Sequence, residues 1–261
     1  MSDGAGAGAM RLVEERDGAV LVLTMDYPAR RNALAMPLRT AMLEALERAV
    51  ADRAVRAVVL TGSGGHFCSG GDISGMDVSD ALAGRERMRR SHALVRLMAM
   101  GQLPIVAAVE GYCVGAGLSL ACACDTVVAA EDARFGAGFG RIGLMADLGL
   151  PHTLPARIGQ GRARQILLYH TQLSAPEAER IGLIDHVVPK GHALASALEK
   201  ARFLAEQAPA PIALTKQILG EGLDRALEDE RHFQSTLFLT DDFSEGRAAF
   251  LEKRAPTFKG G

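Results

Sequence analysis

The sequence predicts a mixed α/β fold. Short apolar runs rich in β-branched residues alternate with longer segments whose apolar residues repeat at helical spacing. This alternation is typical of a sheet covered by helices. The pattern changes near residue 195, after which only helical spacing continues to the end of the chain. We therefore expect a sheet-containing core followed by a helical C-terminal region.

Four segments are expected to form buried strands, because each is a short run of apolar residues that are mostly small or β-branched. They are Val20–Met25, Ala57–Leu60, Ile105–Val109 and Thr126–Ala130.

Helices are expected between these strands. Pro37–Ala51 carries apolar residues at helical spacing behind a proline suited to a first turn. A second helix is expected from about residue 85 to Met100, and a third is expected to begin near Gly117. In the C-terminal region we expect breaks between helices near Pro209–Pro211 and Thr240–Ser244.

The length of 261 residues allows one large domain, or one domain with an appended subdomain. The first ten residues, MSDGAGAGAM, lack the basic start and the apolar stretch of a signal peptide. We expect them to form a disordered lead-in at 1–10. The core is then expected at 11–195 and the helical C-terminal region at 196–261.

Composition narrows the class of protein. Apolar residues make up 48% and charged residues 23% of the chain, as in a globular protein with a sizeable core. The formal net charge of −2 argues against a nucleic-acid binder or a membrane-surface binder. No apolar run reaches the roughly 18–20 residues that span a bilayer. We therefore expect neither a nucleic-acid partner nor a membrane.

The four cysteines form no CxxC pair and have no histidine cluster beside them. Cys122 and Cys124 stand in an apolar run, where cysteine usually acts as a small hydrophobic residue. We therefore expect no metal site. Free cysteines are typical of reducing compartments, so a cytoplasmic location is expected.

Two glycine-rich turns are the strongest functional signals. HFCSGGDIS (66–74) and GYCVGAGLS (111–119) each follow a predicted strand and place small residues where the backbone can approach a ligand. Neither carries a GxGxxG motif in the right place, which argues against a dinucleotide site.

Two interpretations of these turns stay open. The turns can direct two backbone N–H groups at one oxygen, the second from a helix N-terminus, and so form an oxyanion hole. Alternatively, the glycines only permit tight turns and close helix packing.

The same turns resemble motifs of the crotonase, or enoyl-CoA hydratase/isomerase, superfamily. HFCSGGDI resembles the family's F-x-x-G-x-D-[IL] turn, and GYCVGAGLSLACACD resembles its G-x-x-x-G-[GA]-G-x-x-L-x-x-x-C-D stretch. The resemblance covers about residues 11–258. It continues, in order, in ARRNAL (29–34), FGAGFGRIGLMADLG (135–149), SAPEAERIGLIDHVV (174–188) and FLEKRAPTF (250–258).

This resemblance implies a crotonase-like spiral of ββα units, in which the core at 11–195 binds an acyl-CoA thioester and carries out catalysis. Coenzyme A would arrive as part of the substrate, so no separate cofactor is expected. The helical region at 196–261 would build a homotrimer or a hexamer composed of two trimers.

The resemblance also implies roles for single residues. The family stabilises an enolate formed from the thioester carbonyl, and by position its two oxyanion donors would be the backbone N–H groups of Gly71 and Ala116. Asp72 is expected to fix a turn rather than to react. Phe250 and Lys253 would contact the CoA of a neighbouring subunit. The remaining positions implied in CoA binding are Arg31, Ala33, Ser69, Gly71 and Ile73.

The chain departs from the hydratases of the family at both glutamates that activate and protonate water. Those positions hold Ser119 and Phe139 here, and neither side chain replaces a carboxylate as a base at neutral pH. We expect both to line the substrate pocket. Asp147, eight residues after Phe139, matches the aspartate of 1,2-epoxyphenylacetyl-CoA isomerase-like members, although the family's preceding proline is Ala146 here.

A single carboxylate is sufficient for an isomerase, because it can remove an α or γ proton and return it at the other end of the allylic system. Phe139 would exclude water, which suppresses hydration and raises the pKa of the carboxyl group. The leading hypothesis is therefore an enoyl-CoA isomerase, of the Δ3/Δ2 or ring type, that uses Asp147 and the amides of Gly71 and Ala116.

Three other functions remain open. The first is an enoyl-CoA hydratase. The second is an acyl-CoA hydrolase or dehalogenase in which Asp147 or Ser119 is the nucleophile. The third is a non-catalytic acyl-CoA-binding protein. Met, Leu and Phe residues in the predicted pocket loops suggest an apolar acyl chain or ring.

Overall fold

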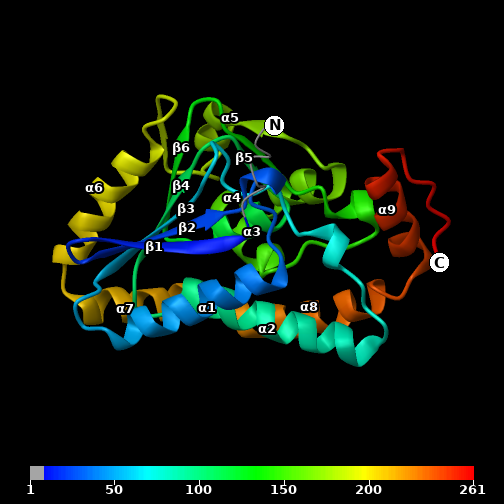
Figure 1. Ribbon diagram of the computed structural model, residues 1–261, viewed down its shortest axis with the longest axis horizontal. Coiled ribbons are helices and arrows are strands. Elements are labelled where there is room, and N and C mark those ends of the chain that lie inside the picture. The colour runs from blue at the N-terminus through cyan, green and yellow to red at the C-terminus, as the bar shows by residue number, and fades with distance from the viewer. Residues whose placement is uncertain (1–8) are drawn as a thin grey trace, which may run out of the picture.

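The computed structural model describes residues 9–261, in which helices pack on both sides of a central sheet (Figure 1). Residues 1–8 of the lead-in expected at 1–10 lie outside the described residues.

The larger sheet has six strands in the order β1-β2-β3-β4-β6-β9. β1 pairs with β2 in antiparallel orientation, and all other neighbours in this sheet are parallel. β3 and β4 are buried along nearly their whole length, as expected for parallel strands that are covered on both faces. The strands are β1 (Arg11–Asp17), β2 (Val20–Asp26), β3 (Ala57–Gly62), β4 (Ile105–Val109), β6 (Thr126–Ala130) and β9 (His186–Val188).

A second, smaller sheet consists of β5 (Tyr112–Val114), β7 (Arg134–Gly136) and β8 (Leu173–Ser174). β5 follows β4 and β7 follows β6 after short turns, so the chain passes twice from the larger sheet to the smaller one before it enters a helical segment. This repeated order of two strands and a helical segment confirms the α/β prediction.

No helix of residues 9–261 is both long and apolar enough to cross a membrane.

The helical segments include three short 3-10 helices, which border the loops of the candidate site. The 3-10 helices are η1 (Pro28–Arg30), η2 (Ile73–Gly75) and η3 (Phe139–Ile142). The α-helices are α1 (Met36–Ala51), α2 (Ala81–Met100), α3 (Ala116–Cys122), α4 (Leu150–Tyr169), α5 (Ala175–Arg180), α6 (Ala193–Glu206), α7 (Pro209–Leu219), α8 (Leu223–Leu237) and α9 (Asp241–Glu252).

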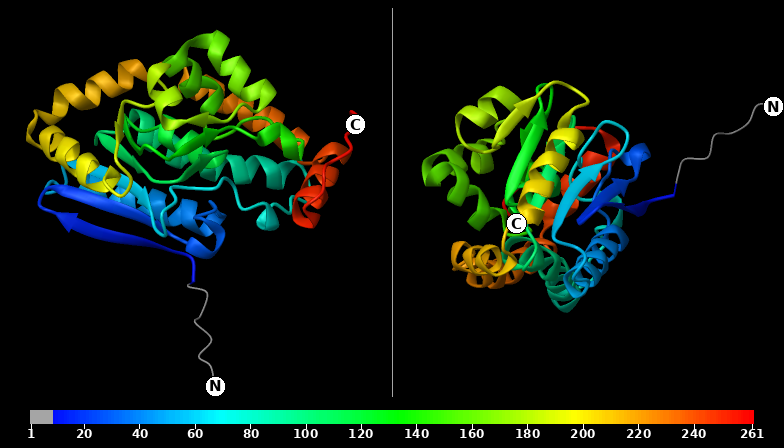
Figure 2. Two further views of the ribbon diagram at one scale, coloured as in Figure 1. Left: turned by 90° about the horizontal axis from the view of Figure 1, so that it is seen from above. Right: turned by 90° about the vertical axis from the view of Figure 1, so that its left-hand side faces the viewer.

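The larger sheet separates two hydrophobic clusters, because successive side chains of a strand point to opposite faces. On one face, valines and alanines pack against α6, which presents Ala193, Ala197 and Ala201 at a spacing of one helical turn. Figure 2 shows α6 along this face. The opposite face supports the main core, to which α1, α2 and α3 contribute leucines and methionines.

The C-terminal helices pack on the core of the same chain. α2 lies between α1 and α8 (Figure 1). α9 packs on η3, where a Cβ at Gly246 would lie only 2.5 Å from the carbonyl carbon of Ile142. The C-terminal region therefore reaches the loops that follow the strands.

The four predicted strands and three predicted helices of the core are present. The C-terminal breaks lie at residues 207–208, where α7 then begins at Pro209, and at 238–240, where Thr240 caps α9. A further break at 220–222 was not predicted; it ends with Gly222 at a φ angle of 88°.

The sequence pattern missed several elements of the core, namely strands β1, β5, β7, β8 and β9 and helices α4 and α5. β1 is an edge strand whose residues are exposed or only partly buried, so it lacks an apolar run. α4 contains Pro155 and a non-helical residue, Gly159, which conceal the helix in the sequence.

Candidate active site

The two glycine-rich turns lie side by side. The N–H of Cys68 donates to the carbonyl oxygen of Tyr112 over 2.9 Å, and the N–H of Val114 donates to the carbonyl oxygen of Cys68 over 3.0 Å. Cys68 and Cys113 thus form a parallel bridge. The turn after β3 is thereby fixed to the segment after β4.

Glycine is required where these turns approach each other. Gly70 and Gly115 have positive φ angles of 112° and 55°. A Cβ at Gly115 would lie 3.4 Å from the Cα of Gly70, and one at Gly117 would lie 2.5 Å from the carbonyl oxygen of Cys68. These glycines permit close packing of the two turns, since each turn occupies the space that a side chain on the other would need.

The backbone amides of Gly71 and Ala116 have no hydrogen-bond acceptor in the part of the chain that the structure describes. Ala116 is the first residue of α3, where an N–H group has no partner within the helix. Neither of these two N–H groups donates a hydrogen bond to any residue of 9–261. Two free amides on adjacent turns provide the donors that an oxyanion hole requires.

The predicted CoA segment runs alongside the first turn. The N–H of Ser69 donates to the carbonyl oxygen of Arg31 over 2.9 Å. The two segments pair again between Leu34 and Gly71, and Ala33 lies between these contacts. The structure therefore brings four of the predicted CoA positions onto neighbouring backbone.

The remaining predicted positions are Asp72, Ile73, Phe250 and Lys253. Asp72 is confirmed as a turn-fixing residue, because its carboxylate accepts a hydrogen bond from the N–H of Ser74 over 3.1 Å and caps η2. Ile73 is buried. Phe250, on α9, and Lys253, just after it, are exposed to solvent. Their contact with a neighbouring subunit stays a prediction.

Asp147 lies between η3 and α4 and is almost fully buried, with 5% of its surface exposed. Its Oδ1 atom has no hydrogen-bond partner among residues 9–261. Burial raises the pKa of Asp147 to about 6. Arg39 opposes this shift, Glu230 adds to it, and His92 and Arg87 oppose it more weakly. A buried carboxylate with one free oxygen and such a pKa is suited to accept and return a proton near neutral pH.

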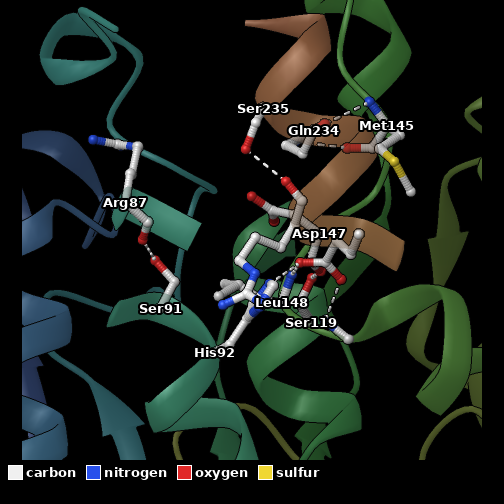
Figure 3. A network of polar contacts seen from close by, with 12 residues as sticks. Arg87, Ser91, His92, Ser119, Met145, Asp147, Leu148, Gln234 and Ser235 are labelled. Carbon is white, nitrogen blue, oxygen red and sulfur yellow. Dashed lines mark hydrogen bonds and ion pairs between the residues drawn. The ribbon is translucent and has the colours of Figure 1, made fainter. Parts of the chain in front are cut away.

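Ser119 supports the segment of Asp147 from α3. It is fully buried, and its hydroxyl donates to the main-chain carbonyl oxygen of Asp147 over 2.8 Å (Figure 3). Phe139 begins η3 and packs, partly buried, against the main core. The structure thus brings Ser119 and Asp147 together, whereas the role of Ser119 and Phe139 in lining a substrate pocket stays a prediction.

Sequence reasoning missed four titratable side chains that surround Asp147. Arg39 from α1 is 2% exposed and donates to the hydroxyl of Ser91 over 2.7 Å. A Cβ at Gly71 would lie 3.7 Å from its guanidinium group, which places Arg39 beside the first glycine turn. The other three are Arg87 and His92 from α2 and Glu230 from α8.

Helical spacing contains a signal for two of these residues. Arg39 shares its buried face of α1 with Met42 and Leu46. Glu230 lies on the stripe of α8 that includes Leu223 and Leu227. A charged residue in line with the apolar side of a helix indicates a buried and paired charge rather than a solvent-exposed one.

Comparisons with known proteins match this chain over nearly its whole length. A family model described as enoyl-CoA hydratase/isomerase matches residues 15–261. The 2,3-dehydroadipyl-CoA hydratase of Escherichia coli (strain K12) is 36% identical over 253 residues, which cover 95% of this chain and 98% of that protein. The 1,2-epoxyphenylacetyl-CoA isomerase of the same strain is 34% identical over 249 residues, covering 92% and 95%.

Solved structures agree with the sequence comparisons. The crystal structure of an enoyl-CoA hydratase from Mycobacterium avium subsp. paratuberculosis K-10 superposes with a TM-score of 0.85 at 34% identity, covering 95% of this chain and 98% of that one. The crotonase-like fold implied by the sequence motifs is therefore confirmed.

Proposed function

Because this chain belongs to the enoyl-CoA hydratase/isomerase family, we propose that it is an enzyme that moves the double bond of an enoyl-CoA thioester. Asp147 would be its single acid–base group. Coenzyme A enters with the substrate, and the proposed reaction needs no other cofactor.

In the proposed mechanism, the carboxylate of Asp147 removes a proton from C2 of a Δ3-enoyl thioester. The electrons move into the thioester carbonyl and give a dienolate, whose oxygen accepts hydrogen bonds from the amides of Gly71 and Ala116. Asp147 then returns the proton to C4, which leaves a Δ2-enoyl thioester. No atom is gained or lost.

The observation that carries this proposal is that Asp147 is buried and that its Oδ1 atom has no hydrogen-bond partner among residues 9–261. With a pKa of about 6, Asp147 is mostly ionised at pH 7–8 and is a stronger base than an exposed aspartate. The two glutamate positions of the hydratases hold Ser119, whose hydroxyl is engaged by backbone, and Phe139. One proton-transfer group is what an isomerase needs, whereas hydration by the two-carboxylate route needs two.

Hydration is the second candidate, favoured by the name of the 2,3-dehydroadipyl-CoA hydratase that this chain resembles. Turnover of two substrates separates the candidates. We expect 3-hexenoyl-CoA to be isomerised by the wild type and not by Asp147→Asn, while crotonyl-CoA is barely hydrated. Rapid hydration of crotonyl-CoA that persists in Asp147→Asn would show that another base acts and that this proposal is wrong. Binding of CoA thioesters without any turnover would favour the non-catalytic function.

We also propose that the chain assembles into a homotrimer or a hexamer, with Phe250 and Lys253 touching the CoA of a neighbouring subunit. The support is the exposure of apolar side chains on α7, where Leu214, Ile218 and Leu219 are 59%, 73% and 77% exposed. Clustered exposed apolar residues mark interaction surfaces. Sedimentation equilibrium of the purified protein is expected to give three or six times the mass of the chain, and a monomer at micromolar concentration would contradict the proposal.

A further inference from the structure

Glu230 is a buried carboxylate whose hydrogen bonds all point at the segment of Asp147 or at α2. It is 1% exposed. Its Oε1 atom lies 2.7 Å from Nε2 of His92 and accepts a hydrogen bond from the N–H of Leu148 over 2.8 Å. Its Oε2 atom accepts from the N–H of Gly149 over 2.8 Å. Both backbone groups can only donate, so both oxygens of Glu230 act as acceptors toward this backbone.

The two amides that Glu230 binds belong to an unusual backbone. Leu148 and Gly149 are consecutive left-handed residues, with φ angles of 56° and 73°. Glycine adopts this conformation freely, but leucine does so at an energetic cost. Leu148 and Gly149 lie in a turn, and successive backbone N–H groups in a turn form a concave anion-binding site. The carboxylate of Glu230 occupies it and offsets the strain.

This strained backbone starts at the residue after Asp147. The carbonyl oxygen of Asp147 accepts a hydrogen bond from Ser119, and the N–H of Leu148 in the same peptide group donates to Glu230. Figure 3 shows Ser119, His92 and Leu148 gathered around Asp147. The peptide group that joins Asp147 to Leu148 is therefore held at both its oxygen and its N–H, while Oδ1 of the Asp147 side chain has no partner among residues 9–261. These backbone contacts hold Asp147 in place.

We propose that Glu230, held in place by His92, is a positioning residue that fixes the backbone at Leu148 and Gly149 and thereby aims the carboxylate of Asp147. The proposal rests on the proposed function, because it assumes that Asp147 moves the proton. It assigns a part in the reaction to α8, a helix of the C-terminal region. This part requires no contact between α8 and the substrate.

The groups around Asp147 predict a shift of the pH–rate profile when Glu230 is changed. A residue that only supported the structure would not cause this shift. The groups that face Asp147 are Arg39 from α1, Arg87 and His92 from α2, and Glu230 from α8. Glu230 raises the pKa of Asp147, whereas the other three lower it. Neutralising Glu230 therefore moves the acid limb of the pH–rate profile to lower pH, and neutralising His92 moves it to higher pH.

The test compares Glu230→Gln with Glu228→Gln, a matched change on the exposed side of the same helix. For Glu230→Gln we expect kcat with 3-hexenoyl-CoA to fall at least tenfold with less than a threefold change in KM, and the acid limb to move to lower pH. Glu228→Gln is expected to change neither. An unchanged kcat and acid limb in Glu230→Gln overturns the proposal, as does a loss that heating curves attribute entirely to unfolding.

Hydrogen exchange measured by mass spectrometry tests the backbone contact without any substrate. The amides of Leu148 and Gly149 are expected to exchange faster in Glu230→Gln and at the wild-type rate in Glu228→Gln. If Glu230→Gln does not fold, His92→Gln replaces it, with faster exchange and an acid limb at higher pH as the expected results. Unchanged exchange in the folded variant overturns the proposal.

Asp147→Asn, measured in the same assay, separates the two proposals. If Asp147→Asn is inactive and Glu230→Gln behaves as wild type, only the positioning role is wrong. If Asp147→Asn keeps its activity and the wild-type acid limb, the proposed function fails and the positioning role fails with it.

Discussion

The Asp147→Asn variant is expected to lose at least about a hundredfold in kcat, because a positioned acid–base group contributes roughly 10²–10⁴-fold to the rate. The same variant is expected to be more stable than the wild type at pH 8. Folding transfers this carboxylate from water to a site where it is 5% exposed and one oxygen has no partner among residues 9–261. Asparagine has nearly the same shape and carries no charge, so it avoids most of that desolvation penalty. Loss of activity with a gain in stability marks a residue kept for its chemistry.

The gain in stability depends on pH. In the unfolded chain Asp147 has a pKa near 3.8, and in the folded chain its pKa is about 6. Below 3.8 both states are protonated and the carboxyl group does not affect stability through its charge. As the pH rises from 3.8 to about 6, the buried charge lowers the free energy of unfolding more and more, and above about 6 it lowers this free energy by its full amount. This full amount is on the order of 1–3 kcal/mol.

Thermal or urea unfolding at pH 8 and pH 5 measures this difference. Asp147→Asn is expected to exceed the wild type in stability clearly at pH 8 and by about half as much at pH 5. Asp77→Asn is the matched control, because Asp77 is exposed, and it should follow the wild type at both pH values. A variant that is less stable than the wild type at pH 8 would show that the charge of Asp147 is compensated, with Arg39 as its partner.

The second large effect is expected from Gly117→Ala. A Cβ at this position would lie 2.5 Å from the carbonyl oxygen of Cys68 and 2.8 Å from its Cβ. That oxygen accepts the hydrogen bond from Val114 that joins the two glycine turns, so it cannot yield without separating them. We expect destabilisation of about 1–3 kcal/mol from overpacking. Helix propensity alone would favour alanine in α3 by roughly 1 kcal/mol, so the sign of the effect identifies its cause.

Turnover should fall together with stability in Gly117→Ala. The amides of Gly71 and Ala116 lie on the two turns that the new methyl group pushes apart, and a displacement of about 1 Å can cost a hundredfold in rate. Gly75→Ala is the matched control, because a Cβ there meets no atom within 4 Å. Equal stability and turnover in Gly117→Ala and the wild type would mean that the turns can separate without harm, and would speak against an oxyanion role for these amides.

Four strands of the larger sheet and the two turns could be predicted from the sequence because their signals are local. A strand such as Ile105–Val109 is a continuous apolar run, and each glycine turn follows its strand within a few residues. Gly71, Ala116 and Asp147 followed from motifs whose spacing is fixed along the chain. These predictions depend on short stretches of sequence that need no knowledge of what packs against them.

The charged surroundings of Asp147 could not be predicted in the same way. The spacing of Glu230 with Leu223 and Leu227 indicates a buried charge, but it does not say which groups pair with that charge. The partners of Glu230 result from the packing of α8 on α2, which no local pattern specifies. The left-handed conformation of Leu148 also cannot be predicted from the sequence, because leucine rarely adopts a positive φ angle.

The position of Glu230 after Asp147 and after all the strands in the sequence has a consequence for protein synthesis. The ribosome releases the chain from its N-terminus, so the strands and the segment of Asp147 emerge before α8 exists. Until then, the amides of Leu148 and Gly149 have no carboxylate to bind, and the left-handed backbone lacks its stabilising contact. We expect nascent and prematurely terminated chains to fold much of the sheet while remaining without activity. Enzyme activity would therefore report that translation of the chain has passed α8.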